Sequence, residues 1–267
     1  MAGDELRHSY VDLSLDTEAR RARLFDTHGF VCECERCGTA GGGGGCSIGL
    51  PTNRDDWDLW PLWDGLRAHG WEGLAERTIP SLVRVRIDDA MTASGGMSEP
   101  DRHAMDHKTG VLRRRAREFM IDDDSERELQ CLNDAVKVYA SKGDGRKWLS
   151  PFHGELYALR CEYLSALLAN GRIVEAIEQC EHIVSFLAVA FSHVGCHPLL
   201  GLQLFTLGDL YSGAVPSEEG SLAAKDVKFT YKMKAKAAYS WAKKIMVVTH
   251  GAKDHMVQTL DDNLANL

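Results

Sequence analysis

After about residue 109, apolar residues recur at intervals of three or four positions through much of the chain. Residues 152–170 place their apolar side chains on one face of a helix, and residues 173–191 do the same. Between these segments, Asn170 and Gly171 supply a helix stop. We therefore expect two antiparallel helices joined by a short turn.

Two more helices are expected at 198–212, where Pro198 suits a first helical turn, and at 226–248. The expected helix ends at Gly171 and Gly213 lie 213 − 171 = 42 residues apart. This repeat suggests stacked helical hairpins of the tetratricopeptide kind, longer than the usual repeat of about 34 residues. The expected fold class is therefore mainly α, with tetratricopeptide-like hairpins.

The sequence before these helices has a different pattern. Asp16 or Thr17 can cap a short helix, and Gly29 can end it. The run "GTAGGGGGCSIG" then indicates a flexible loop, because each glycine loses much backbone freedom when it is ordered. Residues 47–110 carry no comparable pattern, and we expect a loop-rich insertion there.

Three cysteines, Cys32, Cys34 and Cys37, fall within six positions. Zinc is held by four tetrahedral ligands, so three local thiolates leave one position to fill. Cys46, His28 or a more distant residue could supply the fourth ligand. The spacing favours a structural zinc site over a catalytic one, since no histidine-rich or glutamate-bearing ligand motif accompanies it. Three unrelated cysteines are the alternative.

Composition narrows the possible partners and the compartment. A net charge of −8 and a pI near 5.8 argue against direct nucleic-acid binding. No apolar run approaches the ~20 residues of a membrane span, and the start "MAGDELRHSY" lacks a secretory signal, so we expect no membrane partner. We expect an intracellular protein of the cytoplasm, the nucleus or both, with buried reduced cysteines in helix-like segments. These are Cys131, Cys161, Cys180 and Cys196.

The segment "GDELRHSYVDLSLDTEARRARLFDTHGFVCECERC" resembles the end of the SET domain and the post-SET segment of SET- and MYND-domain (SMYD-type) lysine methyltransferases. Further on, "GELYALRCEYLSALLANGRIVEAIEQC", "HPLLGLQLFTLGDLY" and "THGAKDH" resemble the tetratricopeptide-like C-terminal domain of that family. The resemblance implies four regions. They are the end of SET (1–28), a post-SET zinc-binding segment (29–46), the insertion (47–110) and the helical domain (111–267).

Members of this family transfer a methyl group from S-adenosylmethionine to a protein lysine. Tyr10 matches the tyrosine whose hydroxyl lies beside the reacting amine, where a phenol can orient the lone pair. Phe30 matches the aromatic residue that packs on the cofactor adenine. His28 stands where the family has a second tyrosine in the substrate channel, and a histidine at that position can still form a hydrogen bond.

The resemblance also implies that Cys32, Cys34 and Cys37 are the post-SET zinc ligands, and that the fourth zinc cysteine of the family belongs to its Asn-His-Ser-Cys motif. The family's Asn-His-Ser-Cys motif, its glycine-rich cofactor strand and its MYND zinc finger do not occur in these 267 residues. We therefore expect the C-terminal part of a methyltransferase, inactive alone because most of the cofactor pocket is absent. Its partner would be a protein substrate lysine. The alternative is a tetratricopeptide-like module with a zinc knot that binds partner peptides.

Overall fold

The computed structural model describes residue 11 and residues 17–31, 99–140, 152–191, 196–215 and 222–267. Within these ranges all regular secondary structure is helical, which confirms the mainly α fold class. The helices are α1 (Thr17–His28), α5 (Glu99–Ile121), α6 (Ser125–Ala140), α7 (Gly154–Ala169), α8 (Ile173–Ala190), α9 (Pro198–Gly213), α10 (Leu222–Thr249) and α11 (His255–Asn266).

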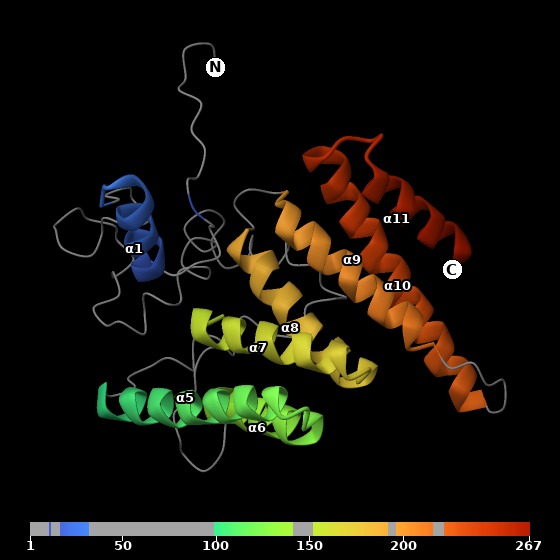
Figure 1. Ribbon diagram of the computed structural model, residues 1–267. Coiled ribbons are helices and arrows are strands. Elements are labelled where there is room, and N and C mark those ends of the chain that lie inside the picture. Colours follow the sequence, from blue (N-terminus) through green and yellow to red (C-terminus); the bar gives the residue numbers. More distant parts are fainter. Residues whose placement is uncertain (1–10, 12–16, 32–98, 141–151, 192–195, 216–221) are drawn as a thin grey trace, which may run out of the picture.

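From α5 to α11, each helix packs against the next one in the sequence. Figure 1 shows a stack that runs from α5 and α6 through α7 and α8 to α9, α10 and α11. Helices α7 and α9 begin at Gly154 and Pro198, which are 198 − 154 = 44 residues apart. The structure therefore confirms tetratricopeptide-like hairpins that repeat at a length close to the one expected from the sequence.

The two helices that open these hairpins begin in the same way. The side chain of His153 caps α7 by accepting a hydrogen bond from the backbone N–H of Glu155, at 3.2 Å. His197 caps α9 by accepting from the N–H of Leu199, at 3.3 Å. Each cap requires a lone pair on Nδ1, so both imidazoles accept at that nitrogen. Histidine is an uncommon N-cap, and its role was not expected from the sequence.

The turn between α7 and α8 forms where the Asn-Gly pair predicted it. The Asn170 side chain donates to the carbonyl of Ala166 at 2.8 Å, and Gly171 has a φ of +67°. That left-handed conformation favours glycine, and the next N–H, of Arg172, returns to the carbonyl of Leu167 at 2.9 Å. The helix stop at 170–171 is therefore confirmed.

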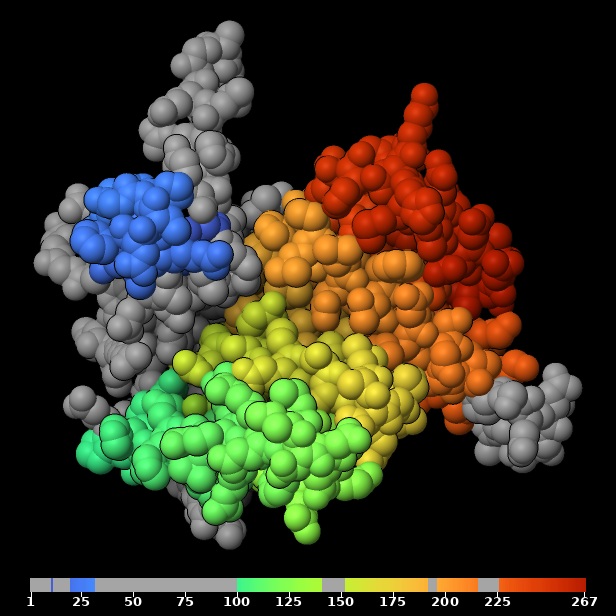
Figure 2. All heavy atoms as spheres, viewed as in Figure 1, coloured from blue at the N-terminus to red at the C-terminus, as the bar shows by residue number. Residues whose placement is uncertain are grey.

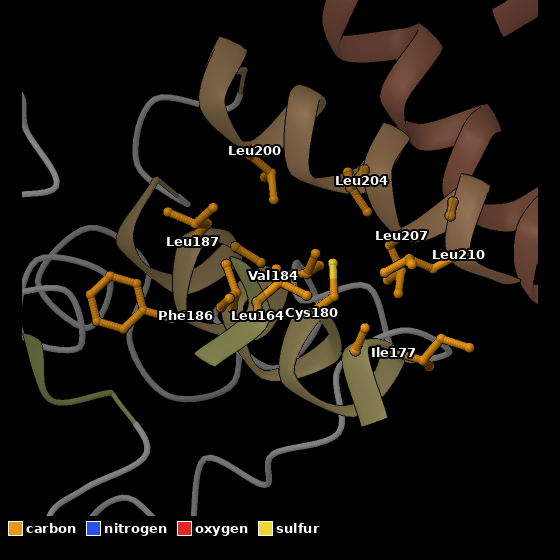
Figure 3. Close-up of a cluster of buried hydrophobic side chains, with 14 of the residues drawn as sticks. Leu164, Ile177, Cys180, Val184, Phe186, Leu187, Leu200, Leu204, Leu207 and Leu210 are labelled. Atoms are coloured by element: carbon orange, nitrogen blue, oxygen red, sulfur yellow. The ribbon is translucent and has the colours of Figure 1, made fainter. Parts of the chain in front are cut away.

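The core lies between the faces that the apolar spacing selected. Figure 3 shows apolar side chains of α8 and α9 that point toward one another, with Leu164 of α7 among them and Phe186 at the margin of the cluster. The labelled members from α8 and α9 are Ile177, Cys180, Val184, Phe186, Leu187, Leu200, Leu204, Leu207 and Leu210. Full burial of one such leucine stabilises the fold by about 1.5–3 kcal/mol, so this interface holds the two hairpins together.

Helices α9 and α10 approach each other closely because small residues line their contact. Gly208 lies against the ring of Tyr239, and Gly201 lies against Ile245 and Met246. The facing positions of α10 are fully buried alanines at 235, 238 and 242. Without side chains at the glycines, the two backbones come nearer than leucine-lined helices would.

Two features differ from the expected element borders. Helix α5 begins at Glu99 and therefore runs through position 110, the expected end of the insertion. The helix α11, His255–Asn266, was not anticipated, although Asp254 caps it by accepting from the N–H of Met256 at 2.8 Å. The four domain borders stay predictions.

The four cysteines predicted to be buried and reduced are all free thiols, but Cys131, Cys161 and Cys196 are only partly buried, so the burial prediction is correct for Cys180 alone. Cys180 is fully buried, and its thiol donates to the carbonyl of Gln203 at 3.8 Å. No helix in the described ranges has an apolar stretch long enough to cross a bilayer.

Candidate functional site

Helix α1 is the described part of the segment that carries the candidate site. Its side chains at Arg20 and Leu24, one turn apart, are buried. The helix ends at Gly29, whose φ of +72° and hydrogen bond from its N–H to the carbonyl of Phe25, at 2.9 Å, close the last turn. This confirms Gly29 as the helix stop and directs the chain into the cysteine-bearing segment.

The structure brings two of the candidate residues together at the end of α1. The ring centroids of His28 and Phe30 lie 6.4 Å apart, with their planes inclined by 37°. Phe30 is 41% exposed, and its neighbour Val31 is exposed as well. Figure 2 shows α1 in blue on one flank of the molecule. An exposed aromatic ring beside an imidazole can stack on a flat ligand and donate or accept a hydrogen bond.

The other candidates, Tyr10, Cys32, Cys34, Cys37 and Cys46, lie outside the described residues. Their roles stay predictions, as do those of His28 and Phe30. Among the residues that the structure describes, no three histidine, cysteine or acidic side chains form a group that could hold a metal ion. Three thiolates within six positions remain a donor set suited to zinc.

A partly buried polar cluster joins α5, α6 and the start of α7. Arg102 donates to Asp106 at 2.9 Å, and the Tyr139 hydroxyl donates to the same carboxylate at 2.9 Å. A guanidinium nitrogen of Arg102 lies 3.0 Å from Nε2 of His153. Burial, followed by the charge of Arg102, lowers the pKa of His153 well below its ordinary value of 6.5. The neutral imidazole, with its lone pair on Nδ1, is therefore the form that caps α7.

A second cluster joins α8, α9 and α10 around the buried carboxylate of Glu181. The Tyr211 hydroxyl donates to it at 2.5 Å, and the Lys234 ammonium lies 3.1 Å from the same oxygen. The ammonium also lies 5.1 Å from the centroid of the Tyr211 ring. These contacts compensate the desolvation of a buried charge. Both clusters link helices and so stabilise the hairpin stack.

Sequence reasoning did not find either cluster. The partners are separated by 30 or more residues in most of these contacts, for example by 53 between Lys234 and Glu181. The available signal was a charged residue inside an apolar run, as in "QCEHIVSFLAVAF". Such a residue is rarely buried unless it is paired, but the run does not name the partner.

Comparison with known proteins finds similarity over a short part of the chain. No protein-family model matches the chain. The chain is 51% identical over 35 residues to a SET domain-containing protein of Acanthamoeba polyphaga mimivirus, which is 13% of this chain and 14% of that protein. It is 50% identical over 38 residues to the N-lysine methyltransferase SMYD2-A of Xenopus laevis, which is 14% of this chain and 9% of that protein.

A SET and MYND domain-containing protein of Dictyostelium discoideum is 49% identical over 35 residues, 13% of this chain and 10% of that protein. The match therefore spans 14% or less of the length of each of these relatives. An identity of about one half over 35 to 38 residues is too high to result from similar amino-acid composition alone, so it indicates a sequence relationship. Through this short segment, the chain is related to the SET- and MYND-domain proteins.

Proposed function

We propose that this chain is the C-terminal portion of an S-adenosylmethionine-dependent protein-lysine N-methyltransferase of the SET type. The observation that carries the proposal is the identity near one half, over 35 residues, to SET-domain proteins. The SET-like segment described above, residues 3–37, has the same length, since 37 − 3 + 1 = 35. One of the relatives is named as an N-lysine methyltransferase, which supports the choice of reaction.

In this proposal the cofactor, when bound, supplies the methyl group. Tyr10 orients the lysine amine and helps to exclude water, which favours the neutral amine as the nucleophile. The exposed ring of Phe30 offers a face for the adenine, and His28, with its ring centroid 6.4 Å away, borders the substrate channel. The SET core that would complete the pocket includes the Asn-His-Ser-Cys motif, which does not occur in this sequence.

The functional test is methyl transfer to lysine by the chain extended with the reading frame upstream in its transcript. We expect transfer that Tyr10→Phe abolishes and that Tyr231→Phe, a control in α10, leaves unchanged. The unextended chain should show no heat of S-adenosylmethionine binding in calorimetry. An upstream frame without the Asn-His-Ser-Cys motif, or an extended chain that transfers no methyl group, would overturn the enzyme assignment. Micromolar binding of S-adenosylmethionine by the unextended chain would contradict the proposal that most of the cofactor pocket is missing from it.

We propose further that Cys32, Cys34 and Cys37 hold one zinc ion, with Cys46 as the fourth ligand. A segment this short has no core of its own, so metal binding would hold its shape. Zinc content of the purified chain tests this, with Cys131→Ser in α6 as the matched control, because Cys131 is a free, half-buried thiol. We expect about one zinc per chain in the control and much less in Cys37→Ser and Cys46→Ser. Unchanged zinc in Cys46→Ser rejects that ligand, and unchanged zinc in Cys37→Ser rejects the site.

A second candidate function is a peptide-binding module built from the helical hairpins. The observation that favours it is the 44-residue repeat from α7 to α9, two helices of 16 residues that each begin with a histidine cap. Stacked hairpins of this kind form extended binding surfaces. Cofactor binding by the extended chain separates the two functions, since a module without an enzyme activity has no need of S-adenosylmethionine.

A further inference from the structure

Helix α10 is strongly basic in a chain that is otherwise acidic. It contains seven lysines, one aspartate and no arginine, for a charge of 7 − 1 = +6. The whole chain carries −8, so the remainder carries −8 − 6 = −14. A helix that holds this much positive charge apart from the rest of the molecule has a local potential opposite to that of the whole protein.

One face of α10 is apolar and exposed, although its opposite face already lies in the core. The buried face includes Tyr239 and the alanines that contact α9. The exposed face carries Phe229 at 67% exposure, Met233 at 51%, Trp241 at 38% and Val248 at 70%. These positions differ by four, eight and seven residues, which places them along one side of the helix. The side chains extend over 19 residues, or about 29 Å.

Lysines accompany this apolar row. The ammonium of Lys244 lies 4.6 Å from the centroid of the Trp241 ring, and Lys236 follows Met233 by three positions. Neither lysine has an acidic partner in the part of the chain that the structure describes. By contrast, Lys243 on the flank pairs with Asp261 of α11. We use the name outward face of α10 for Phe229, Met233, Lys236, Trp241, Lys244 and Val248.

We propose that the outward face of α10 docks on an anionic lipid surface. Lysines near such a surface attract it without any fixed geometry, whereas protein interfaces are depleted of lysine and enriched in arginine. Tryptophan with a nearby cation is typical of the membrane–water interface, where the apolar ring and the charge occupy different depths. All basic residues of α10 are lysines and none is an arginine, which favours a lipid surface over an acidic peptide as the partner.

The shape of the face supports the same partner. Its residues belong to a single helix whose other side is covered by α9 and α11, so a partner protein could not enclose α10 in a groove. A row about 29 Å long on one convex helix can meet a planar surface along its whole length. The sequence-based expectation of no membrane partner rested on the lack of a spanning segment, and a peripheral contact requires no such segment.

The negative charge of the rest of the chain opposes binding of α10 to an anionic surface and makes the binding sensitive to orientation and salt. Charges more than about 8 Å from the surface are largely screened at physiological salt, so attraction depends on α10 facing the lipid. Asp226, one turn before Phe229, is the acidic residue of α10 and weakens the face at that end. Binding should therefore be weak, orientation-dependent and lost at high salt.

The test is cosedimentation of the full chain with vesicles of phosphatidylcholine alone or of equal parts phosphatidylcholine and phosphatidylserine. We expect binding only to the vesicles with phosphatidylserine. Each lysine should contribute about fivefold, so Lys236→Gln with Lys244→Gln should weaken binding about 25-fold. The matched control, Lys108→Gln with Lys137→Gln on α5 and α6, changes the net charge equally and should change binding little.

A second pair of variants tests the apolar row separately. Phe229→Gln should weaken binding to the mixed vesicles, whereas Ile121→Gln, at an exposed apolar residue at the end of α5, should not. Circular dichroism establishes that each variant is folded. Equal losses in the test and control variants, or no binding to either vesicle, would overturn the proposal. A third result would also overturn the proposal. In that result the chain binds no vesicles but binds a synthetic peptide of alternating glutamate and leucine, and this binding is lost when Lys236 and Lys244 are replaced. The result is independent of methyl transfer.

Discussion

The contact between Gly208 and Tyr239 offers a sharp test of how α9 and α10 pack. A methyl group built on Gly208 would lie 2.4 Å from Cε1 and 2.5 Å from Cδ1 of the Tyr239 ring. The ring has little freedom to move, because it is buried and its hydroxyl donates to Asp209 at 2.7 Å. Gly208→Ala should therefore push α9 and α10 apart or displace the ring.

Two opposing terms set the size of the effect. Adding volume to a tightly packed contact costs about 1–3 kcal/mol, whereas replacing a helical glycine by alanine stabilises a helix by about 1 kcal/mol. Gly110 in α5 isolates the second term, since it is exposed and a methyl group there would have no atom within 4 Å. Gly110→Ala should be more stable than the wild type, and Gly208→Ala should be less stable than Gly110→Ala by about 1–3 kcal/mol.

Urea unfolding followed by the helical circular dichroism signal measures both variants. In thermal unfolding, the same difference corresponds to about 2–4 °C for each kcal/mol in a chain of this size. Tyr239→Leu provides a second check, because the smaller side chain should reduce the cost of Gly208→Ala in a double-mutant cycle. Equal stability of Gly208→Ala and Gly110→Ala would refute the close approach of α9 and α10.

Three other predictions follow from the buried polar groups. Because the folded state holds His153 neutral, with a pKa well below 6.5, the unfolded chain binds a proton that the folded chain does not. Stability should then fall as the pH is lowered below about 6.5, and His153→Asn, which can still cap α7, should show a shallower pH dependence of the urea midpoint. Burial raises the pKa of Cys161 to about 11, so its alkylation by iodoacetamide at mildly alkaline pH should be much slower in the native than in the unfolded chain, as peptide mass spectrometry can measure. Lys234→Met removes the ammonium that pairs with the Glu181 carboxylate and should lower the free energy of unfolding by about 1.5–3 kcal/mol. Adding Glu181→Gln to this variant should restore part of the lost stability. An equal or larger loss in the double variant would contradict the pairing of Lys234 with Glu181.

The candidate site shows which functional residues can be predicted from residue types and spacing alone. The cysteine spacing and the resemblance to SET-domain proteins selected Tyr10, His28, Phe30 and the zinc cysteines. The structure describes two of these residues, His28 and Phe30, which flank the turn at Gly29 and whose rings lie near each other. His28 and Phe30 are only two positions apart in the chain, so the sequence alone was enough to predict that their rings are close.

Local pattern determined helices α7 and α8 and the turn between them. The apolar period of 152–170 and 173–191 marked α7 and α8, and the Asn-Gly pair marked the turn between them. Each of these features is decided within one or two helical turns, because backbone hydrogen bonds and side-chain periodicity act over three or four residues. The period of the hairpins could be read in the same way, to within two residues of the observed 44.

Only the tertiary structure decided which polar groups are buried and which helix faces stay open. Glu181 is tolerated in the core because Tyr211 and Lys234, 30 and 53 residues away, reach it. Gly208 matters because the ring of Tyr239 from the next helix occupies the space beside it. The apolar row of α10 is exposed because neither α9 nor α11 covers that side. Such contacts join residues distant in the chain, and a local periodic pattern contains no information about distant partners.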